Sequence, residues 1–537
     1  MDKKEFNLLK EPWIRVLTLD GHEKLCSLIE VFEEGVFLKE LSGELPTQNF
    51  AIYRLLLAIL HAAFGKREDG MYPSLDDGSH IELSAEDLLL RWKTIWNNKS
   101  FPEYLFEYLD ENEDRFWLFH PERPFFQVSK MPVATSYDAA KLNGELSESA
   151  NKIRLFPLRT GKEKQQMTYA EAARWLLHVN AFDDTSAKPR GTREGKLPSP
   201  GAGWLGRLGL IIAEGDNLFE TLLLNWVLLT EDKDLWGVER PTWQADEART
   251  EERVYVNVPD NQSELLTLQS RRLLLQREGT YVTGYLLLGG DILDPEQEVG
   301  VEQMTIWRKR EKVKEGERLN TPRRHNPERQ LWRDIDSLLL ASEDSDKKSR
   351  IPGVVSWLSF LMRKNILKDA PLILKTASIQ YGDKDFFAAD VFEDKVIFAR
   401  SLIREESEAK RDAVIELISW TDDLVKTLGS LARQINFAEG GDLKSANAAA
   451  AEARRQGYFV LDIPFRHWLS TFNTEKVLEE RESWQKTATN IIRKQGEALV
   501  HKASYKAIKG RTVEDKSYSS AQAFNYFLAM IKRKGAV

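Results

Sequence analysis

A stripe of apolar residues near the C-terminus constrains the fold of this chain more than any other feature. The residues recur at alternating intervals of four and three, the spacing of a helix face that packs against other helices. They are Leu417, Thr421, Leu424, Leu428, Leu431 and Ile435. A second face combines Val477, Trp484, Ala488 and Ile491, and a third helix is expected at 521–534. Three to five such helices predict an antiparallel bundle as a separate C-terminal domain, residues 398–537.

The preceding residues, 1–397, have the patterns of a mixed α/β domain. Short apolar runs around Trp13 and the pair Asp20-Gly21 predict a hairpin. Residues 47–64 are apolar on nearly every face, which predicts a helix buried in a large domain. Further helices are expected at 84–98, capped by Ser84, and at 169–182, and β-like runs occupy 254–292. The fold class predicted for the whole chain is therefore α+β.

Two long segments of this domain lack regular periodicity. Between 129 and 167 the helical pattern fades, and residues 141–164 mix glycine, polar and basic residues, which predicts a long loop. Residues 186–204 contain four glycines and three prolines, which exclude a regular helix. Loops of this length within a compact protein are usually functional or disordered.

Composition limits the possible partners and compartments. The 537 residues carry 84 acidic and 76 basic side chains, a net charge of −8, so nucleic-acid binding requires a local basic patch or shared partners. The single cysteine, Cys26, excludes an intramolecular disulfide and a zinc-thiolate site and favours the cytoplasm. No signal peptide or membrane span is expected, because the start lacks an apolar core and the longest apolar run is interrupted by Arg54 and His61.

Motifs for catalysis are not found. Each Gly-Lys pair is followed by Arg, Glu or Leu, so no phosphate-binding P-loop is present. The eight histidines are scattered, with no HExxH motif or His-Asp dyad. Paired carboxylates remain possible in a chain with 84 acids, but such pairs also arise by chance. We therefore expect a protein that is not an enzyme and holds no cofactor or metal.

Three basic segments suit nucleic-acid contacts. In the first, cations alternate with an aromatic ring that could stack on a base: its residues are Asn151, Lys152, Arg154 and Phe156. The alternative is a solvated loop whose Phe156 fills the core.

The second segment is rich in glycine, which lets the backbone approach a sugar-phosphate chain or minor groove closely. Its candidate residues are Lys188, Arg190, Gly191, Arg193 and Lys196, and the alternative is a flexible connector. The third segment, 305–333, contains ten basic and four acidic residues, and the basic ones include Arg308 and Lys309. A solvated charged face is the alternative there.

Several motifs, in order along the chain, resemble the CasA family, the large subunit of the type I-E CRISPR Cascade complex. They are FNLLKEPWI at 6–14, PERPFFQ at 121–127, AEAARWLLH at 170–178, GWLGRLG at 203–209, EGDNL at 214–218 with ETLLLN at 220–225, and VEQMTIWR at 301–308. Each motif is weak, but their order and spacing together are specific and cover essentially the whole chain.

The resemblance implies a mixed α/β domain followed by a C-terminal four-helix bundle. It also implies a non-catalytic subunit that recognises the protospacer-adjacent motif (PAM) in double-stranded DNA, promotes duplex opening and R-loop formation, and docks a helicase-nuclease. The implied partners are the crRNA and the backbone, 5′-handle-binding and small subunits of Cascade.

Site residues follow from the resemblance by position. The family's first loop falls on 143–164 and its glycine-rich loop on 188–203, where this chain spreads its glycines and adds cations. The glutamine wedge falls on 380–386, where Lys384 occupies the usual glutamine position and Gln380 lies just upstream. Arg308 and Lys309 are substitutes for the PAM-contacting lysine. Two alternatives stay open: a purely structural scaffold subunit and a metal-dependent nuclease.

Overall fold

The computed structural model describes most of the chain. The described residues are 3–131, 133–145, 159–185, 199–230, 233–234, 236–245, 249–294, 297, 299–310, 320–339, 350–513 and 516–534.

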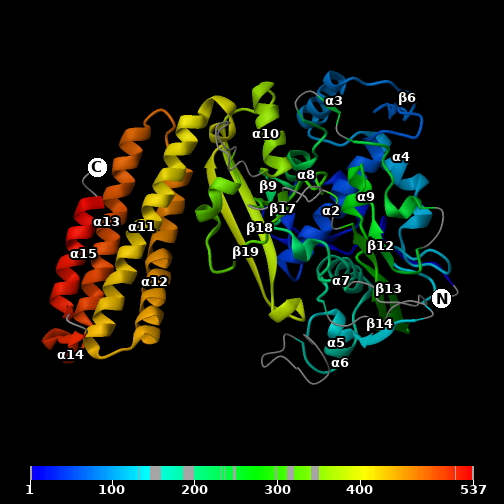
Figure 1. Ribbon diagram of the computed structural model, residues 1–537. Helices are drawn as coiled ribbons and strands as arrows, with labels where there is room; N and C mark the ends of the chain where they lie inside the picture. Colours follow the sequence, from blue (N-terminus) through cyan, green and yellow to red (C-terminus); the bar gives the residue numbers. More distant parts are fainter. Residues whose placement is uncertain are drawn as a thin grey trace. The chain divides into compact units, whose positions relative to one another are not determined.

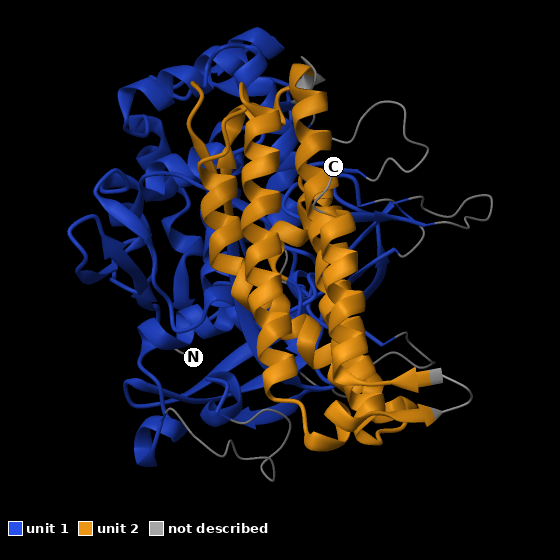
Figure 2. Cartoon of the chain, turned by 90° about the vertical axis from the view of Figure 1, so that its left-hand side faces the viewer, with its two compact units in different colours: residues 1–329, 341–367, 373–395 blue, residues 330–340, 368–372, 396–537 orange. Residues whose placement is uncertain are grey.

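The chain divides into two compact units (Figure 2). Unit 1 comprises Met1–Arg329, Ala341–Leu367 and Ile373–Lys395. Unit 2 comprises Gln330–Leu340, Lys368–Leu372 and Val396–Val537. Unit 2 thus contains two short segments that precede the predicted start of the bundle at residue 398.

Unit 1 begins with a small antiparallel sheet. Strand β2 (Ile14–Thr18) lies between β3 (Glu23–Cys26) and β4 (Leu38–Leu41). Gly21 has a φ of 87° in the β2–β3 turn, a conformation that glycine adopts without steric cost. The hairpin predicted from Asp20-Gly21 is confirmed.

The core of unit 1 is built around helix α2 (Pro46–Phe64). Almost every side chain of α2 is buried, as its apolar sequence predicted. Helices α7 (Tyr169–Phe182) and α9 (Gln262–Leu266) pack against it. Arg54 of α2 donates to Glu302 over 2.9 Å, so the one charge in the middle of the helix is paired where it is buried.

The structure also contains two three-stranded antiparallel sheets. One has the order β13 (Arg271–Glu278), β14 (Tyr281–Gly289), β8 (Thr135–Asp138). The other has the order β19 (Ala388–Ala399), β18 (Pro371–Tyr381), β9 (Ile212–Glu214). Figure 1 shows β18 and β19 as a long hairpin.

The prediction of a long loop at 141–164, within the stretch 129–167 that lacks helical periodicity, is partly wrong. The described residues of 129–167 include β8 and two short helices, α5 (Ala139–Leu142) and α6 (Gly161–Gln165). Strand β8 forms because Thr135 pairs with Leu287 of β14, a contact far away in sequence. Asp138 then caps α5 by accepting from the amide of Lys141, so a side-chain cap rather than periodicity starts this helix.

The other elements of unit 1 are mostly short. Ser84 caps α3 as predicted, with a capping box to Asp87. The other helices are α1 (Leu28–Glu33), α3 (Ala85–Asn98), α4 (Glu103–Glu111), α8 (Leu218–Asn225) and α10 (Gly353–Arg363). The paired strands are β1 (Glu5–Asn7) with β7 (Trp117–Phe119), β5 (Tyr72–Pro73) with β6 (His80–Ile81), β10 (Leu229–Thr230) with β11 (Lys233–Asp234), β12 (Arg253–Val256) with β15 (Asp291–Leu293), and β16 (Trp307–Lys309) with β17 (Asn320–Pro322).

Unit 2 is a helical bundle, as predicted. Its long helices are α11 (Glu408–Glu439), α12 (Leu443–Ser470), α13 (Val477–His501) and α15 (Ser520–Lys534), followed in Figure 1 from yellow to red. The short α14 (Tyr505–Lys509) and the β20–β21 pair (Arg511–Val513, Lys516–Tyr518) precede α15. Every member of the predicted α11 stripe is buried. On α13 the prediction was one residue off, because Ile492 rather than Ile491 continues the buried face of Trp484 and Ala488.

The early segment of unit 2 joins the bundle through aromatic contacts. Trp332 stacks on Phe465 of α12, with ring centroids 4.1 Å apart, and its indole N–H donates to Asp462 over 2.8 Å. Within the described part of the chain, we find no helix whose length and apolar character would carry it across a membrane.

Candidate nucleic-acid interface

The tip of the β18–β19 hairpin carries the two residues predicted as a wedge. Gln380 lies at the end of β18, and Lys384 lies in the turn that follows. The amide of Gly382 donates to the carbonyl of Phe387 over 2.9 Å and closes this turn. Both predicted side chains are exposed, so the hairpin holds them where a ligand can reach them.

The backbone of the tip is unusual. Lys384 and Asp385 both have left-handed conformations, with φ of 53° and 61°. Such conformations cost about 1 kcal/mol or more for residues with a side chain and persist where surrounding contacts hold them. Here the contact is a bidentate ion pair, in which Arg324 donates to both carboxylate oxygens of Asp385 over 2.8 Å.

The tip is also fastened to the end of helix α7. The hydroxyl of Tyr381 donates to the carbonyl of Phe182 over 2.6 Å. The amide of Thr185 donates to the carbonyl of Asp385 over 2.8 Å. Gly206 makes this close approach possible, because a Cβ there would lie 2.2 Å from the hydroxyl of Tyr381.

The glycine-rich segment starts and ends beside this hairpin tip. The buried guanidinium of Arg271 donates to the carbonyl of Asp184 over 2.8 Å and to that of Gly201 over 2.7 Å. It also donates to the carboxylate of Asp183 over 2.6 Å. One arginine therefore holds both ends of the segment together. The predicted contact residues Lys188, Arg190, Gly191, Arg193 and Lys196 lie outside the described residues.

A second arginine fixes the returning end of that segment. Arg207 donates to the carbonyl of Ala202 over 2.8 Å and also bonds the carbonyl of Pro200. Burial, together with the positive charges of Arg271 and Arg324, lowers the pKa of Arg207 to about 10. Arg207 is still charged at neutral pH and supplies positive charge at the base of the segment, whereas Arg271 and Arg324 are paired with Asp183 and Asp385.

The first predicted loop begins in the same place. Lys141 of α5 forms a 3.1 Å ion pair with Asp184, the residue that Arg271 also holds. The side-chain Nδ2 of Asn143 donates to the carbonyl of Lys164 over 3.2 Å and joins the two sides of the loop. The predicted contact residues Asn151, Lys152, Arg154 and Phe156 lie outside the described residues.

The third basic segment reaches the tip through its second strand. Arg308 and Lys309 lie on β16, where Arg308 is exposed and donates to the hydroxyl of Thr321 on β17 over 3.2 Å. Strand β17 ends at Pro322, two residues before Arg324. The short β16–β17 ladder therefore positions Arg324 beside the hairpin tip.

The structure brings together the bases of the two predicted loops and the predicted wedge hairpin, all within unit 1. Sequence reasoning missed the residues that connect them. They are Tyr381, Arg207, Arg271 and Arg324. Three of the four lie in segments that the sequence had singled out: Tyr381 in the wedge region 380–386, Arg207 in the motif at 203–209 and Arg324 in the basic segment 305–333. Their partners were not indicated, because these connections join residues far apart in the sequence and leave no local pattern.

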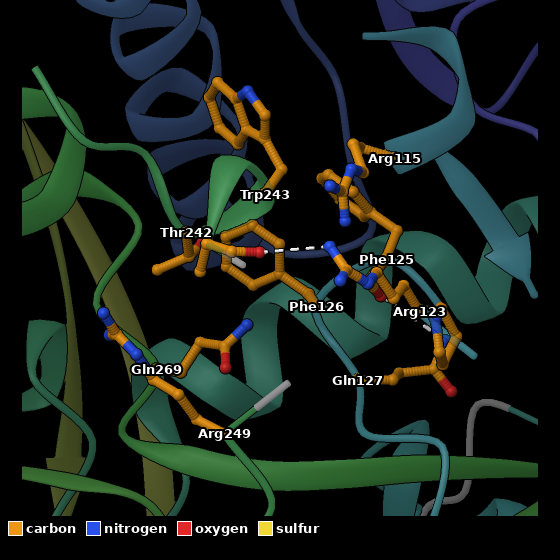
Figure 3. A pocket seen from close by; sticks show the side chains of 11 residues that line it. Arg115, Arg123, Phe125, Phe126, Gln127, Thr242, Trp243, Arg249 and Gln269 are labelled. Carbon is orange, nitrogen blue, oxygen red and sulfur yellow. Dashed lines mark hydrogen bonds between the residues drawn. The ribbon is translucent and has the colours of Figure 1, made fainter. Parts of the chain in front are cut away.

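A second arginine-rich region surrounds a small cavity (Figure 3). Arg115, Arg123 and Arg249 reach its wall from three segments around the ring of Phe126. Phe126 is itself left-handed, with a φ of 54°. Arg123 also donates to the carbonyl of Ala245 over 3.3 Å, so part of its hydrogen-bonding capacity is used within the protein.

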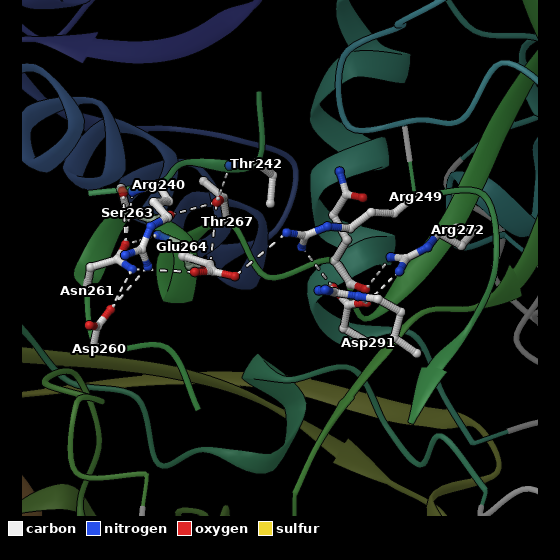
Figure 4. Close-up of polar contacts among 12 residues, drawn as sticks. Arg240, Thr242, Arg249, Asp260, Asn261, Ser263, Glu264, Thr267, Arg272 and Asp291 are labelled. Carbon is white, nitrogen blue, oxygen red and sulfur yellow. Dashed lines mark hydrogen bonds and ion pairs between the residues drawn. The ribbon is translucent and has the colours of Figure 1, made fainter. Parts of the chain in front are cut away.

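Arg249 links this cavity to a buried charge network (Figure 4). Asp291 accepts from Arg253 over 2.8 and 2.9 Å and from Arg272, and Arg249 lies 3.6 Å away. Burial alone would raise the pKa of Asp291, but the hydrogen bonds and charges of Arg253 and Arg272 hold that pKa below its ordinary value. These cations neutralise a buried carboxylate, which makes the network structural.

The described residues offer no candidate site for a metal ion. Among them, no group of three His, Cys, Asp or Glu side chains is placed to hold a metal ion. The only cysteine of the sequence, Cys26, is buried, and burial raises the pKa of its thiol to about 11. The thiol is therefore protonated at neutral pH.

Comparison with known proteins adds a family match. The model of the family described as CRISPR-associated protein Cse1 matches residues 7–495. A relative from Thermus thermophilus, CRISPR-associated protein CasA/Cse1, is 34% identical over 239 residues. That alignment covers 44% of this chain and 42% of the relative, which is less than half the length of either protein.

Solved structures match over nearly the full length. The crystal structure of Thermobifida fusca Cse1 has a TM-score of 0.81 and 30% identity, covering 99% of this chain and 98% of that one. A chain from a structure titled CRISPR RNA-guided surveillance complex has a TM-score of 0.67 and 14% identity, covering 99% and 100%. At 14% identity, the second match shows only that the two chains share a fold.

Proposed function

The chain belongs to the CRISPR-associated Cse1 (CasA) family, the large subunits of the type I-E Cascade complex, and from this premise we propose that it reads the PAM in double-stranded DNA and opens the duplex. The observation that carries the proposal is the convergence at the hairpin tip. Lys141 and Asp184 join the bases of the two loops, and Asp385 joins the second base to the wedge. A reader and an opener of DNA must act at neighbouring base pairs, which this arrangement favours.

The energetics fit a protein that carries little sequence information. Guide pairing supplies most specificity, so the protein needs only a few PAM contacts to decide where pairing begins. Minor-groove contacts discriminate mainly A·T from G·C pairs at about 1–3 kcal/mol per base pair, which would give a permissive set of PAM sequences. The segments 143–164 and 188–203, with Arg308 and Lys309, are the proposed PAM-reading elements.

Opening is assigned to the hairpin tip. Unstacking one base step costs a few kcal/mol, and a side chain inserted beside the PAM would offset part of that cost. Lys384 is exposed at the tip on a backbone that the Arg324–Asp385 pair holds in place. Gln380 is the neighbouring exposed side chain. The resulting single-stranded target would then pair with the crRNA to form the R-loop.

The proposed partners are those of a multi-subunit complex. We assign the crRNA and the backbone, 5′-handle-binding and small subunits as neighbours, because the chain belongs to the Cse1 family. Docking of the helicase-nuclease on this subunit belongs to the same proposal. The chain itself is proposed to catalyse no reaction, and metal-dependent DNA cutting by the purified chain would contradict that part.

A purely structural scaffold is the rival function. It is favoured by the bundle of unit 2, whose exposed Phe459 and Ile463 lie one turn apart on α12 and offer an apolar surface to another protein. A scaffold would hold subunits together without contacting the PAM.

A gel-shift experiment separates the two functions. Complex assembled with and without this subunit is titrated with a PAM-bearing duplex and with a matched duplex lacking the PAM. A reader gives tighter binding of the PAM duplex only when the subunit is present. Equal binding of the two duplexes by an intact complex would leave the scaffold role and remove the PAM-reading role. The assembled complex is required because the acidic subunit alone has little long-range attraction for DNA.

A further inference from the structure

We propose that Arg324 is a positioning residue that latches the hairpin tip to Thr185, just beyond the end of α7, so that Lys384 meets a duplex in a fixed orientation. The consequence for DNA rests on the proposed function, whereas the latch itself rests on contacts among described residues. It adds a residue and a mechanical coupling to the site.

The first step is the geometry of the ion pair. Two N–H groups of Arg324 donate to the two oxygens of Asp385, each over 2.8 Å. Only a planar guanidinium can make both bonds at once, so a lysine would keep the charge and lose the fixed orientation. The two side chains are 34% and 30% exposed, which leaves the pair partly shielded from water.

The second step is that Asp385 holds two elements at once. Its carboxylate binds Arg324, and its carbonyl accepts from the amide of Thr185 over 2.8 Å. Thr185 is the last described residue before the glycine-rich segment. Fixing the side chain of Asp385 therefore also fixes the acceptor that holds the start of that segment.

The third step is that Arg324 is itself anchored. Its guanidinium lies 5.2 Å from the ring centroid of Tyr381, a cation–π distance. The hydroxyl of Tyr381 is bonded to the carbonyl of Phe182 at the end of α7. Arg324 thus contacts the strand before the turn and the residue within the turn, and α7 provides the rigid support.

The latch reinforces a turn with two successive left-handed residues, Lys384 with a φ of 53° and Asp385 with a φ of 61°. Two backbone hydrogen bonds lie within this turn, from the amide of Asp385 to the carbonyl of Gly382 over 3.0 Å and from the amide of Phe386 to the carbonyl of Asp383 over 3.2 Å. The Arg324–Asp385 pair adds a side-chain contact that ties the turn to the segment after β17. Without that pair, only the backbone bonds would hold the turn, and it would open more often. Lys384 would then lose its fixed direction relative to Thr185.

Hydrogen exchange on the full-length chain tests the latch directly. Arg324→Gln keeps a polar side chain, although a shorter one, and removes the charge and the fork. We expect amide exchange in residues 382–387 and at Thr185 to speed up about threefold, because the ion pair that is lost is partly exposed to water. Arg324→Lys should also exchange faster than the wild type, because it cannot bond both oxygens.

Two further variants complete the design. Arg240→Gln is the matched control, since Arg240 forms an ion pair with Asp260 elsewhere in unit 1 and should leave exchange at the tip unchanged. Asp385→Asn breaks the latch from the other side and substitutes for Arg324→Gln if that variant does not fold. The double variant Arg324→Gln/Asp385→Asn should exchange no faster than either single variant, because both remove the same interaction.

The outcomes separate the latch from the proposed function. Unchanged exchange at the tip in Arg324→Gln, or additive effects in the double variant, would overturn the latch. The assembled complex then supplies the second readout. Arg324→Gln should slow opening of a PAM-bearing duplex while guide binding stays the same. If Lys384→Ala opens the duplex at the wild-type rate, the wedge assignment within the proposed function fails, whereas the exchange result still decides the latch.

Discussion

Unit 1 contains two clusters of arginines around aspartates, and the two differ mainly in their exposure to solvent. At Asp291 the carboxylate and the side chain of Arg272 are fully buried, and Arg253 and Arg249 complete the neutralisation. At the hairpin tip, Arg324 and Asp385 each keep about a third of their side-chain surface exposed. The same residue types therefore serve two physical purposes.

The difference follows from the cost of removing charge from water. A buried charge must be paired, and removing one partner leaves the others uncompensated at a cost of about 3–5 kcal/mol. A pair at the surface contributes about 0–1 kcal/mol, because water and salt screen it. Asp291 thus fixes the fold of unit 1, whereas Asp385 can direct a local conformation and leave the stability of the unit almost unchanged.

The largest expected effect is at the buried cluster. Asp291→Asn preserves the shape of the side chain but removes the charge that Arg253 and Arg272 surround. We expect the free energy of unfolding of unit 1 to fall by about 3 kcal/mol. Urea denaturation followed by tryptophan fluorescence measures this loss. Asp385→Asn is the matched control and should cost less than about 1 kcal/mol; equal losses for the two variants would contradict the comparison.

The stability of the protein at acidic pH is a further test of the buried Asp291 cluster. Because the pKa of Asp291 is lower in the folded protein, its stabilising contribution is present above the unfolded pKa of about 3.9 and is lost as the pH falls through the lower folded value. The stability of the wild type should therefore decline in this acidic window by more than that of Asp291→Asn. Parallel pH profiles for the two proteins would show that Asp291 is not held in its charged form.

The next effect is on function rather than stability. Lys384→Ala removes the exposed side chain of the tip and should slow R-loop formation on a PAM-bearing duplex about tenfold. This factor corresponds to an activation free energy about 1.4 kcal/mol higher, because the side chain no longer offsets part of the cost of unstacking the bases. Guide binding and the unfolding free energy should stay unchanged. Opening kinetics of the assembled complex provide the measurement, with Lys93→Ala, an exposed lysine on α3, as the control. An unchanged opening rate would remove the wedge assignment.

These effects also mark what local sequence patterns could predict. The helices at 47–64 and 169–182 and the α11 stripe were predictable because their apolar pattern lies within one segment. Strand β8 was missed, since its partner β14 lies far along the chain and its own four residues have no strong pattern.

The candidate site was predictable only in part. Basic and glycine-rich composition indicated the loops, and the resemblance placed the wedge at 380–386. The contacts that unite them join Arg324 to Asp385 across 61 residues and Arg271 to Asp184 across 87. A single arginine in a sequence does not indicate which distant carbonyl or carboxylate it will bind, so these anchors required the fold.

A smaller effect is expected from the tyrosine that supports the tip. Tyr381→Phe removes the donor of the 2.6 Å bond to the carbonyl of Phe182 and leaves the ring in place for Arg324. The loss should be about 1 kcal/mol, the usual net value of one hydrogen bond. Hydrogen exchange at residues 381–387 measures it. Protection identical to the wild type would show that ring packing alone holds the hairpin on α7.

The smallest effect is expected from a change in salt concentration. This experiment compares the Asp291 and Asp385 clusters without changing the residues around them. Raising the ionic strength from about 0.1 M to about 1 M shortens the Debye length from about 10 Å to about 3 Å. The stability difference between the wild type and Asp385→Asn should shrink by a few tenths of a kcal/mol, because the Arg324–Asp385 pair is partly exposed. The difference between the wild type and Asp291→Asn should not change, since salt does not reach a fully buried carboxylate. Measuring differences removes the general influence of salt on folding, which acts equally on wild type and variant. If both differences shrink together, solvent reaches Asp291, and its network belongs with the surface pairs.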